Sequence, residues 1–276
     1  MDEFGKADEY DAASNPLAGR EPVILLGRGG SGTRLLSQLA LSNGVFLGNA
    51  LNASFDSVEW VETLYDLAIE AVTEGVEKGS QRDLCWRARL RRRAAEILAA
   101  SRRDAACLWG WKLPETMLVL PQVLRAFPQA RVVHLVRHPL SSALRRTHMT
   151  SRLDNPVGRV VLPAAYLACG LDLARMEDDE PYIHNAVTWA YQIDMVLAAW
   201  RAMSSPERRL QLRYEEVCAA PAKAQRQLSD FLGGVAATAG SPAIDCSRIG
   251  DTRIDARAER VRAICGRLAG ELGYEF

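Results

Sequence analysis

The feature that most constrains the fold of this chain is an apolar run followed at once by a glycine-rich turn, at residues 23–36. Val23 to Leu26 predict a short buried strand, because a short apolar run bounded by a turn suits a strand covered on both faces. The segment from Arg34 predicts a helix whose first N–H groups face the turn. The turn itself contains four glycines, which permit tight backbone angles: Gly27, Gly29, Gly30 and Gly32. Strand, turn and helix in this order predict a binding site for a phosphate or sulfate.

Two nucleotide-binding patterns fit this loop only in part. The loop has the G-x-G-x-x-G spacing of a dinucleotide site, which also needs an acidic residue after a second strand about 20 residues further on. The candidate second strand, Val45–Leu47, is followed by Gly48 and Asn49, with no acid. The loop also has the length of a Walker A sequence, but Thr33 occupies the position of the lysine that reaches the terminal phosphates. A nucleoside triphosphatase is therefore disfavoured.

Apolar runs and amphipathic segments alternate along the rest of the chain. Strands are predicted near 108–112, 131–136 and 210–213, and helices over 51–76, 82–103, 121–127, 187–203 and 221–232, with another after Pro139. This alternation predicts an α/β fold with a parallel central sheet flanked by helices. Residues 1–20 are polar and acidic and predict a disordered tail, whereas residues 21–276 predict a single domain.

The composition excludes several classes of protein. The formal net charge is zero, so we expect no general affinity for nucleic acid or for an acidic membrane surface. The chain has no apolar stretch long enough to span a bilayer, and its N-terminus lacks the layout of a signal peptide, which together predict a cytoplasmic protein. The six cysteines are scattered singly, with no histidine at ligand spacing, and so predict reduced thiols rather than a metal site.

Six short motifs occur in order along the chain: Ser31-Gly32-Thr33, Trp111-Lys112-Leu113-Pro114, Phe127 to Pro139, Leu212 to Val217, Phe231-Leu232-Gly233 and Glu271 to Tyr274. Together they resemble the motifs of sulfotransferases that use 3′-phosphoadenosine 5′-phosphosulfate (PAPS). The resemblance implies a P-loop-NTPase-like sulfotransferase fold and transfer of a sulfuryl group, without a metal, to a hydroxyl or amine. The acceptor would be a small molecule, a glycan or a peptide.

By this resemblance the glycine-rich turn is the phosphosulfate-binding loop, with seven candidate binding residues: Arg28, Gly29, Gly30, Ser31, Gly32, Thr33 and Arg34. Its backbone amides and the Thr33 hydroxyl can bind the anion. The family usually has a basic residue where this chain has Gly30, so Arg28 or Arg34 would supply the charge. Lys112 resembles the family lysine that contacts the bridging oxygen, and we expect it to be the main catalytic cation.

The resemblance also suggests where the rest of the donor binds. Arg137 follows the predicted strand 131–136 and would hold the 3′-phosphate. The family usually has a serine eight residues after this arginine, where this chain has Arg145; an arginine can bind the same phosphate, or Ser141 or Ser142 can supply the hydroxyl. Tyr214 would meet the adenine. Late in the chain Arg248 resembles an arginine over the 3′-phosphate, and Arg253 is near enough to share that role.

The general base is the least determined residue. Many relatives that use a carboxylate have it a couple of dozen residues beyond the loop, which in this chain selects Asp56 or Glu59. Asp56 could instead cap the helix predicted after it. The histidines His134, His148 and His184 are the alternatives.

Two other functions stay open at this point. A phosphotransferase or nucleotide hydrolase on a related fold would need Mg²⁺ and a carboxylate ligand for it. A non-catalytic nucleotide-binding protein is suggested by the two departures from the family pattern, Gly30 and Arg145. The arginine-rich stretch 82–103 could steer an acidic acceptor or could simply be a solvated helix face.

Overall fold

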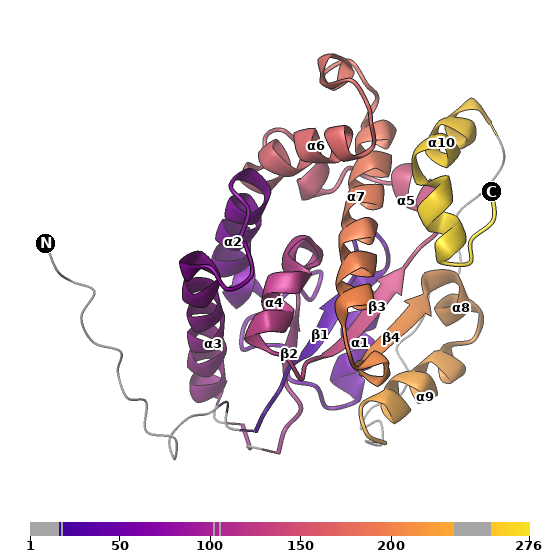
Figure 1. Cartoon of the computed structure of the whole chain (residues 1–276). Coiled ribbons are helices and arrows are strands. Elements are labelled where there is room, and N and C mark those ends of the chain that lie inside the picture. Colours follow the sequence, from indigo (N-terminus) through magenta and orange to yellow (C-terminus); the bar gives the residue numbers. More distant parts are fainter. Residues whose placement is uncertain (1–16, 18, 102, 105, 235–254) are drawn as a thin grey trace, which may run out of the picture.

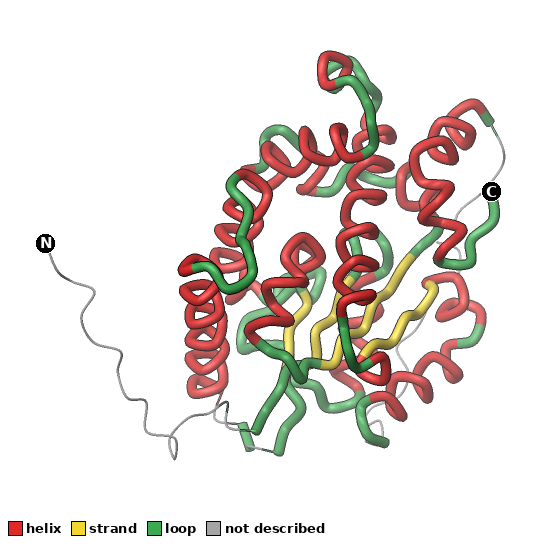
Figure 2. Tube along the Cα trace, in the orientation of Figure 1, coloured by secondary structure: helices red, strands yellow, loops and turns green. Residues whose placement is uncertain are grey.

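The structure is a computed structural model that describes residues 17, 19–101, 103–104, 106–234 and 255–276. Its centre is a parallel sheet with strand order β2-β1-β3-β4 (Figure 1). The strands are β1 (Val23–Leu26), β2 (Gly110–Lys112), β3 (Arg131–Val136) and β4 (Arg209–Arg213). Helices cover both faces of the sheet (Figure 2), so the predicted α/β class and parallel sheet are confirmed.

The α-helices of the described residues are α1 (Thr33–Ser42), α2 (Val61–Thr73), α3 (Gln81–Ser101), α4 (Leu120–Ala126), α5 (Pro139–Ala143), α6 (Pro156–Ala168), α7 (Pro181–Ala202), α8 (Tyr214–Ala219), α9 (Pro221–Phe231) and α10 (Ala256–Glu271). Short 3₁₀ turns lie between them, namely η1 (Val58–Trp60), η2 (Pro114–Val119), η3 (Met149–Ser151), η4 (Leu173–Arg175) and η5 (Pro206–Arg208). None of the helices in these ranges is long and apolar enough to cross a lipid bilayer.

The sheet separates two hydrophobic cores because successive residues of a strand point to opposite faces. In β1, Ile24 and Leu26 pack into one core, which α2, α3, α4, α7 and α10 complete. Val23 and Leu25 pack into the other, with α1, α8 and α9. In Figure 1, α7 accordingly runs across one face of the sheet and α1 lies behind it. All four residues of β1 are buried, which explains its purely apolar sequence.

The prediction was wrong in three places. The helix predicted over 51–76 begins only at Val61, because residues 47–57 form a loop that is closed by the bridge between Leu51 and Ser57. The candidate strand 45–47 forms a single bridge, from Phe46 to Trp109. Helices α6, α8 and α10 were not predicted, although Asn155 and Asp255 cap α6 and α10 with side-chain oxygens, which is an ordinary sequence signal for a helix start.

The packing of β2 against β1 can be tested at Gly110, where the two backbones lie close together. A Cβ atom at Gly110 would lie 1.7 Å from the carbonyl oxygen of Val23, and backbone cannot move aside there. We expect Gly110→Ala to lower the free energy of unfolding by about 3 kcal/mol or more. The control is Gly266→Ala in α10, where the nearest atom is 3.6 Å away and alanine should stabilise the helix by about 0.5–1 kcal/mol. Similar urea denaturation midpoints for the two variants would contradict this packing.

Candidate functional site

A cleft of about 600 Å³ opens at the carboxyl ends of the strands, the edge at which parallel α/β sheets bind ligands. Each strand brings a residue or loop to it: the 29–34 loop after β1, Pro114 just beyond β2, Arg137 after β3 and Tyr214 after β4. Two further segments line it, residues 52–56 and residues 145–152. The predicted site residues are thus largely brought together in one place.

The glycine-rich loop depends on two of its glycines for its shape. Gly30 and Gly32 have φ angles of 90° and 93°, in the left-handed region that favours glycine. A Cβ atom at Gly32 would also lie 2.2 Å from the ring of Tyr214. Gly32 directly precedes α1, whose N-terminus has no side-chain cap. The loop therefore presents the positive end of the α1 dipole to the cleft.

Arg28 does not join the other predicted binding side chains. Its side chain is buried and donates hydrogen bonds to Ser151 Oγ (2.8 Å), Asn185 Oδ1 (2.7 Å) and Thr188 Oγ1 (3.2 Å). Burial lowers the pKa of this guanidinium to about 10. Only the Arg28 backbone remains available to the anion loop, and Arg34, which is exposed and lines the cleft, is the loop's cationic side chain there.

Lys112 is a buried cation that pairs with the cleft-lining Asp56, and 1% of its side chain is exposed. Its Nζ pairs with Asp56 Oδ1 and donates to the carbonyl oxygen of Ser54 at 2.9 Å. Burial lowers the Lys112 pKa from its ordinary value, and the adjacent Asp56 carboxylate opposes that shift. Asp56 lines the cleft and does not cap the following helix, because its carboxylate accepts from Lys112 and from Asn52 Nδ2.

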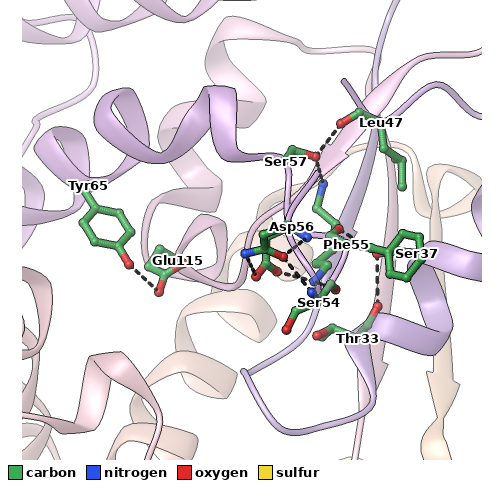
Figure 3. A network of polar contacts seen from close by, with 11 residues as sticks. Thr33, Ser37, Leu47, Ser54, Phe55, Asp56, Ser57, Tyr65 and Glu115 are labelled. Carbon is green, nitrogen blue, oxygen red and sulfur yellow. Dashed lines mark hydrogen bonds and ion pairs between the residues drawn. The ribbon is translucent and has the colours of Figure 1, made fainter. Parts of the chain in front are cut away.

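The backbone around this pair is fixed by Ser57 (Figure 3). Ser57 Oγ donates to the carbonyl oxygen of Leu47 at 2.6 Å and accepts from the Lys112 N–H at 3.0 Å. The Ser57 N–H in turn donates to the carbonyl oxygen of Lys112 at 2.9 Å. Loop 47–57 is therefore attached to the end of β2, which sets the position of Asp56 relative to Lys112.

Glu59, the second predicted carboxylate, accepts hydrogen bonds from a neighbouring turn instead. It accepts from the N–H groups of Asn49 (2.7 Å) and Ala50 (3.3 Å) and from Asn49 Nδ2 (3.1 Å). A Cβ atom at Gly48 would lie 2.5 Å from Glu59 Oε2, so the carboxylate fills the inside of this turn. It is not among the residues that line the cleft. The structure thus separates the two candidate bases.

Arg137 and Tyr214 form a stacked pair at the opposite side of the cleft. The guanidinium carbon of Arg137 lies 4.4 Å from the centre of the Tyr214 ring, and its Nη1 donates to the carbonyl oxygen of Gly30 at 3.4 Å. Burial lowers the Arg137 pKa, and the nearby Arg145 charge lowers it further. Arg145 is exposed and lines the cleft, whereas Ser141 and Ser142 are buried outside its lining. Arg248 and Arg253 lie outside the described residues.

Of the candidate histidines only His148 lines the cleft. His134 is fully buried in β3 against Trp200, and burial lowers its pKa to about 4. His184 contacts the carbonyl oxygen of Met176 through Nε2. Within the described ranges no three histidine, cysteine or acidic side chains are grouped so that they could hold a metal ion.

Glu115 was missed by the sequence analysis, although it directly follows the Trp-Lys-Leu-Pro motif. It is buried, accepts a hydrogen bond from the Tyr65 hydroxyl at 3.3 Å, and lies close enough to Asp56 and Lys112 to interact with their charges (Figure 3). Burial raises its pKa to about 7, an effect to which Asp56 contributes. A carboxyl group that changes its charge near neutral pH therefore lies close to the Lys112–Asp56 pair.

The comparisons with known proteins agree with this geometry. The model of the sulfotransferase family matches residues 22–235. A sulfotransferase domain from the Synechococcus PCC 7002 olefin synthase is 20% identical, with a TM-score of 0.53 over 93% of this chain and 97% of that one. The sulfotransferase domain from the curacin biosynthetic pathway is 19% identical, with a TM-score of 0.50 over 93% and 99%. A Mycobacterium avium sulfotransferase is 15% identical, with a TM-score of 0.51 over 93% and 78%. The search of curated proteins found no match.

The buried Glu115 carboxyl gives a pH test. Its raised pKa means that the fold favours the protonated form, so Glu115 destabilises the protein increasingly as pH rises from its ordinary pKa to about 7. Glu115→Gln keeps an acceptor for Tyr65 without the charge. We expect its gain in unfolding free energy to be under about 1 kcal/mol near pH 5 and on the order of 3 kcal/mol near pH 8. If the unfolding free energies of the unmodified protein and of Glu115→Gln differ by the same amount at every pH in this range, the raised pKa of Glu115 is contradicted.

Proposed function

Because the chain belongs to the sulfotransferase family, we propose that it transfers a sulfuryl group from PAPS to a hydroxyl or amine of an acceptor that binds in the cleft. This proposal rests on the observation that the glycine-rich loop and Asp56, the partner of the buried Lys112, line the same cleft. The family favours this activity over the nucleotide hydrolase that the sequence left open. The proposed reaction uses no metal.

Sulfuryl transfer needs an anion site, a cation at the leaving oxygen and a base for the acceptor. The loop amides, Thr33 and Arg34 would hold the 5′-phosphosulfate. Lys112 would stabilise the charge that develops on the bridging oxygen as the S–O bond breaks. Its burial strengthens this interaction, because few waters screen a charge that is 1% exposed.

Asp56 is the carboxylate we propose as general base. The acceptor oxygen or nitrogen attacks sulfur, its proton passes to Asp56, and adenosine 3′,5′-bisphosphate leaves with the electron pair of the broken S–O bond. The pairing of Asp56 with Lys112 holds the carboxylate in place in the free protein. When the Lys112 ammonium pairs with the leaving phosphate, it no longer pairs with Asp56, and the Asp56 carboxylate can then accept the proton.

The rest of the donor would be bound by the opposite side of the cleft. Arg137 and Arg145 present two guanidinium groups for the 3′-phosphate, and the Tyr214 ring lies against Arg137 where it can pack on the adenine. The mutual repulsion of Arg137 and Arg145, which lowers the Arg137 pKa, would be relieved by a bound dianion. In this account Arg145 replaces the usual serine.

Nucleotide titration tests the donor site. We expect adenosine 3′,5′-bisphosphate to bind more tightly than adenosine 5′-monophosphate by about 1.5–3 kcal/mol, since hydrogen bonds to a charged group contribute about this much. Arg145→Gln should reduce the difference measured by calorimetry. Arg87→Gln, on the exposed face of α3, is the control and should leave it unchanged. Equal affinities of the two nucleotides for the unmodified protein would remove Arg137 and Arg145 from the donor site.

A pair of carboxamide variants tests the base. Asp56→Asn should lower the rate of bisphosphate release from PAPS by about 10² or more, the usual contribution of a general base. Bisphosphate should still bind, and at least as tightly, because Asp56 no longer competes with the phosphate for Lys112. Glu59→Gln should act on the 48–50 turn, with a lower melting temperature and a nearly unchanged rate at a temperature where it is folded. A rate lost in Glu59→Gln and kept in Asp56→Asn would reverse the assignment.

A further inference from the structure

His148 is the histidine of the cleft, and its ring lies directly on the anion loop. A Cβ atom at Gly29 would be 1.7 Å from His148 Cδ2 and 2.0 Å from Nε2. The glycine at this position is therefore what lets the imidazole approach the loop backbone. The ring is also close enough to Lys112 to interact with its charge. His148 thus lies against the loop and within range of the lysine charge.

The hydrogen bonds of Nδ1 determine which ring nitrogen carries the proton. The backbone N–H of Thr150 donates to His148 Nδ1 at 3.4 Å, so that His148 caps the η3 turn. The Thr150 hydroxyl is 3.1 Å from the same nitrogen and itself accepts from Gln192 Nε2 at 3.3 Å. A backbone N–H can only donate, so Nδ1 is the unprotonated nitrogen. In a neutral imidazole the proton is then on Nε2.

The same arrangement occurs a second time in the chain, at His138. There the N–H of Leu140 donates to Nδ1 at 3.2 Å at the start of α5. Its Nε2 lies 2.9 Å from the carbonyl oxygen of Glu275, which can only accept, so Nε2 carries the proton. The ring Nε2–H of His138 therefore donates to a carbonyl oxygen within the protein. The corresponding Nε2 of His148 has no hydrogen-bond partner in the described part of the chain.

The charges around His148 keep the ring neutral. Arg28 from the loop after β1, Lys112 from β2 and Arg146 from its own segment face it, while α7 contributes the uncharged Gln192. Burial and these three cations lower the His148 pKa to about 3. The imidazole is therefore neutral at physiological pH, and its bare nitrogen is already engaged by Thr150. A neutral ring whose bare Nδ1 already accepts a hydrogen bond is a poor general base, but its Nε2–H can donate a hydrogen bond.

We propose that His148 is a catalytic residue that donates its Nε2–H to an oxygen of the sulfuryl group during transfer, and that Thr150 and Gln192 are positioning residues that hold its proton on Nε2. The inference rests on the proposed sulfotransferase function. It deepens that function by adding a neutral donor to the cationic loop and Lys112. No proton leaves His148 in this step, because the acceptor proton goes to Asp56.

Two amide substitutions distinguish a donor from a base. In His148→Gln the side-chain amide can reach the place of Nε2, whereas in His148→Asn it reaches only as far as Nδ1. We expect bisphosphate release from PAPS, with water or an added phenol as acceptor, to slow by less than about tenfold in the first variant. In His148→Asn and His148→Ala it should slow by about 10²–10³, as when one preorganised donor is lost. The affinity for adenosine 3′,5′-bisphosphate, which has no sulfuryl group, should change little in all three.

Ring-nitrogen NMR of the unliganded protein supplies a readout that does not need activity. We expect the Nε2–H form of His148 from about pH 5 to 9, and also in Thr150→Val, which removes the hydroxyl but keeps the backbone N–H that donates to Nδ1. An imidazolium or an Nδ1–H ring near pH 7 would overturn the proposal. So would a His148→Gln variant as inactive as His148→Ala, or loss of bisphosphate binding together with the rate. If the unmodified protein shows no PAPS turnover at all, the proposed function fails, while the NMR result still decides the protonation state of His148.

Discussion

The pairing of Lys112 with Asp56 is the interaction on which the arrangement of the site depends. A lysine that is 1% exposed needs a counter-charge and hydrogen-bond acceptors, because an unpaired buried cation is costly. Asp56 and the Ser54 carbonyl oxygen supply them, and both belong to the loop that Ser57 attaches to the end of β2. The burial of one side chain at the end of a strand thus fixes the position of a whole loop, and with it the wall of the cleft where an acceptor would enter.

Other parts of the cleft follow from the same need to balance charge in a confined place. Arg28 donates to neutral oxygens of η3 and α7 and becomes part of the framework, whereas Arg137 and Arg145 lie close together at the cleft. The glycines let ring side chains approach the anion loop, Tyr214 at Gly32 and His148 at Gly29. The cleft therefore combines several guanidinium groups with a closely packed backbone, and the proposed binding of a multiply charged anion relies on both.

The sequence predicted those features that local patterns determine. The apolar runs located β1, β3 and β4, and the motifs after each strand end placed Lys112, Arg137 and Tyr214 at the correct edge of the sheet. The direction of a side chain was not predictable, because it depends on packing between distant segments. Arg28 turns inward to Asn185, which is 157 residues away, and Glu59 turns toward the N–H groups of the 48–50 turn and away from the cleft. Glu115 and the protonation state of His148 depend on neighbours from several elements, and no local spacing encodes them.

A crystal structure of the protein with adenosine 3′,5′-bisphosphate would show directly whether the cleft is a donor site. We expect the 5′-phosphate in the 29–34 loop within reach of Lys112, the 3′-phosphate on Arg137 and Arg145, and the adenine beside Tyr214. We also expect Lys112 to turn from Asp56 toward the phosphate. A nucleotide bound elsewhere, or one whose 5′-phosphate lies away from both the loop and Lys112, would contradict the proposed function.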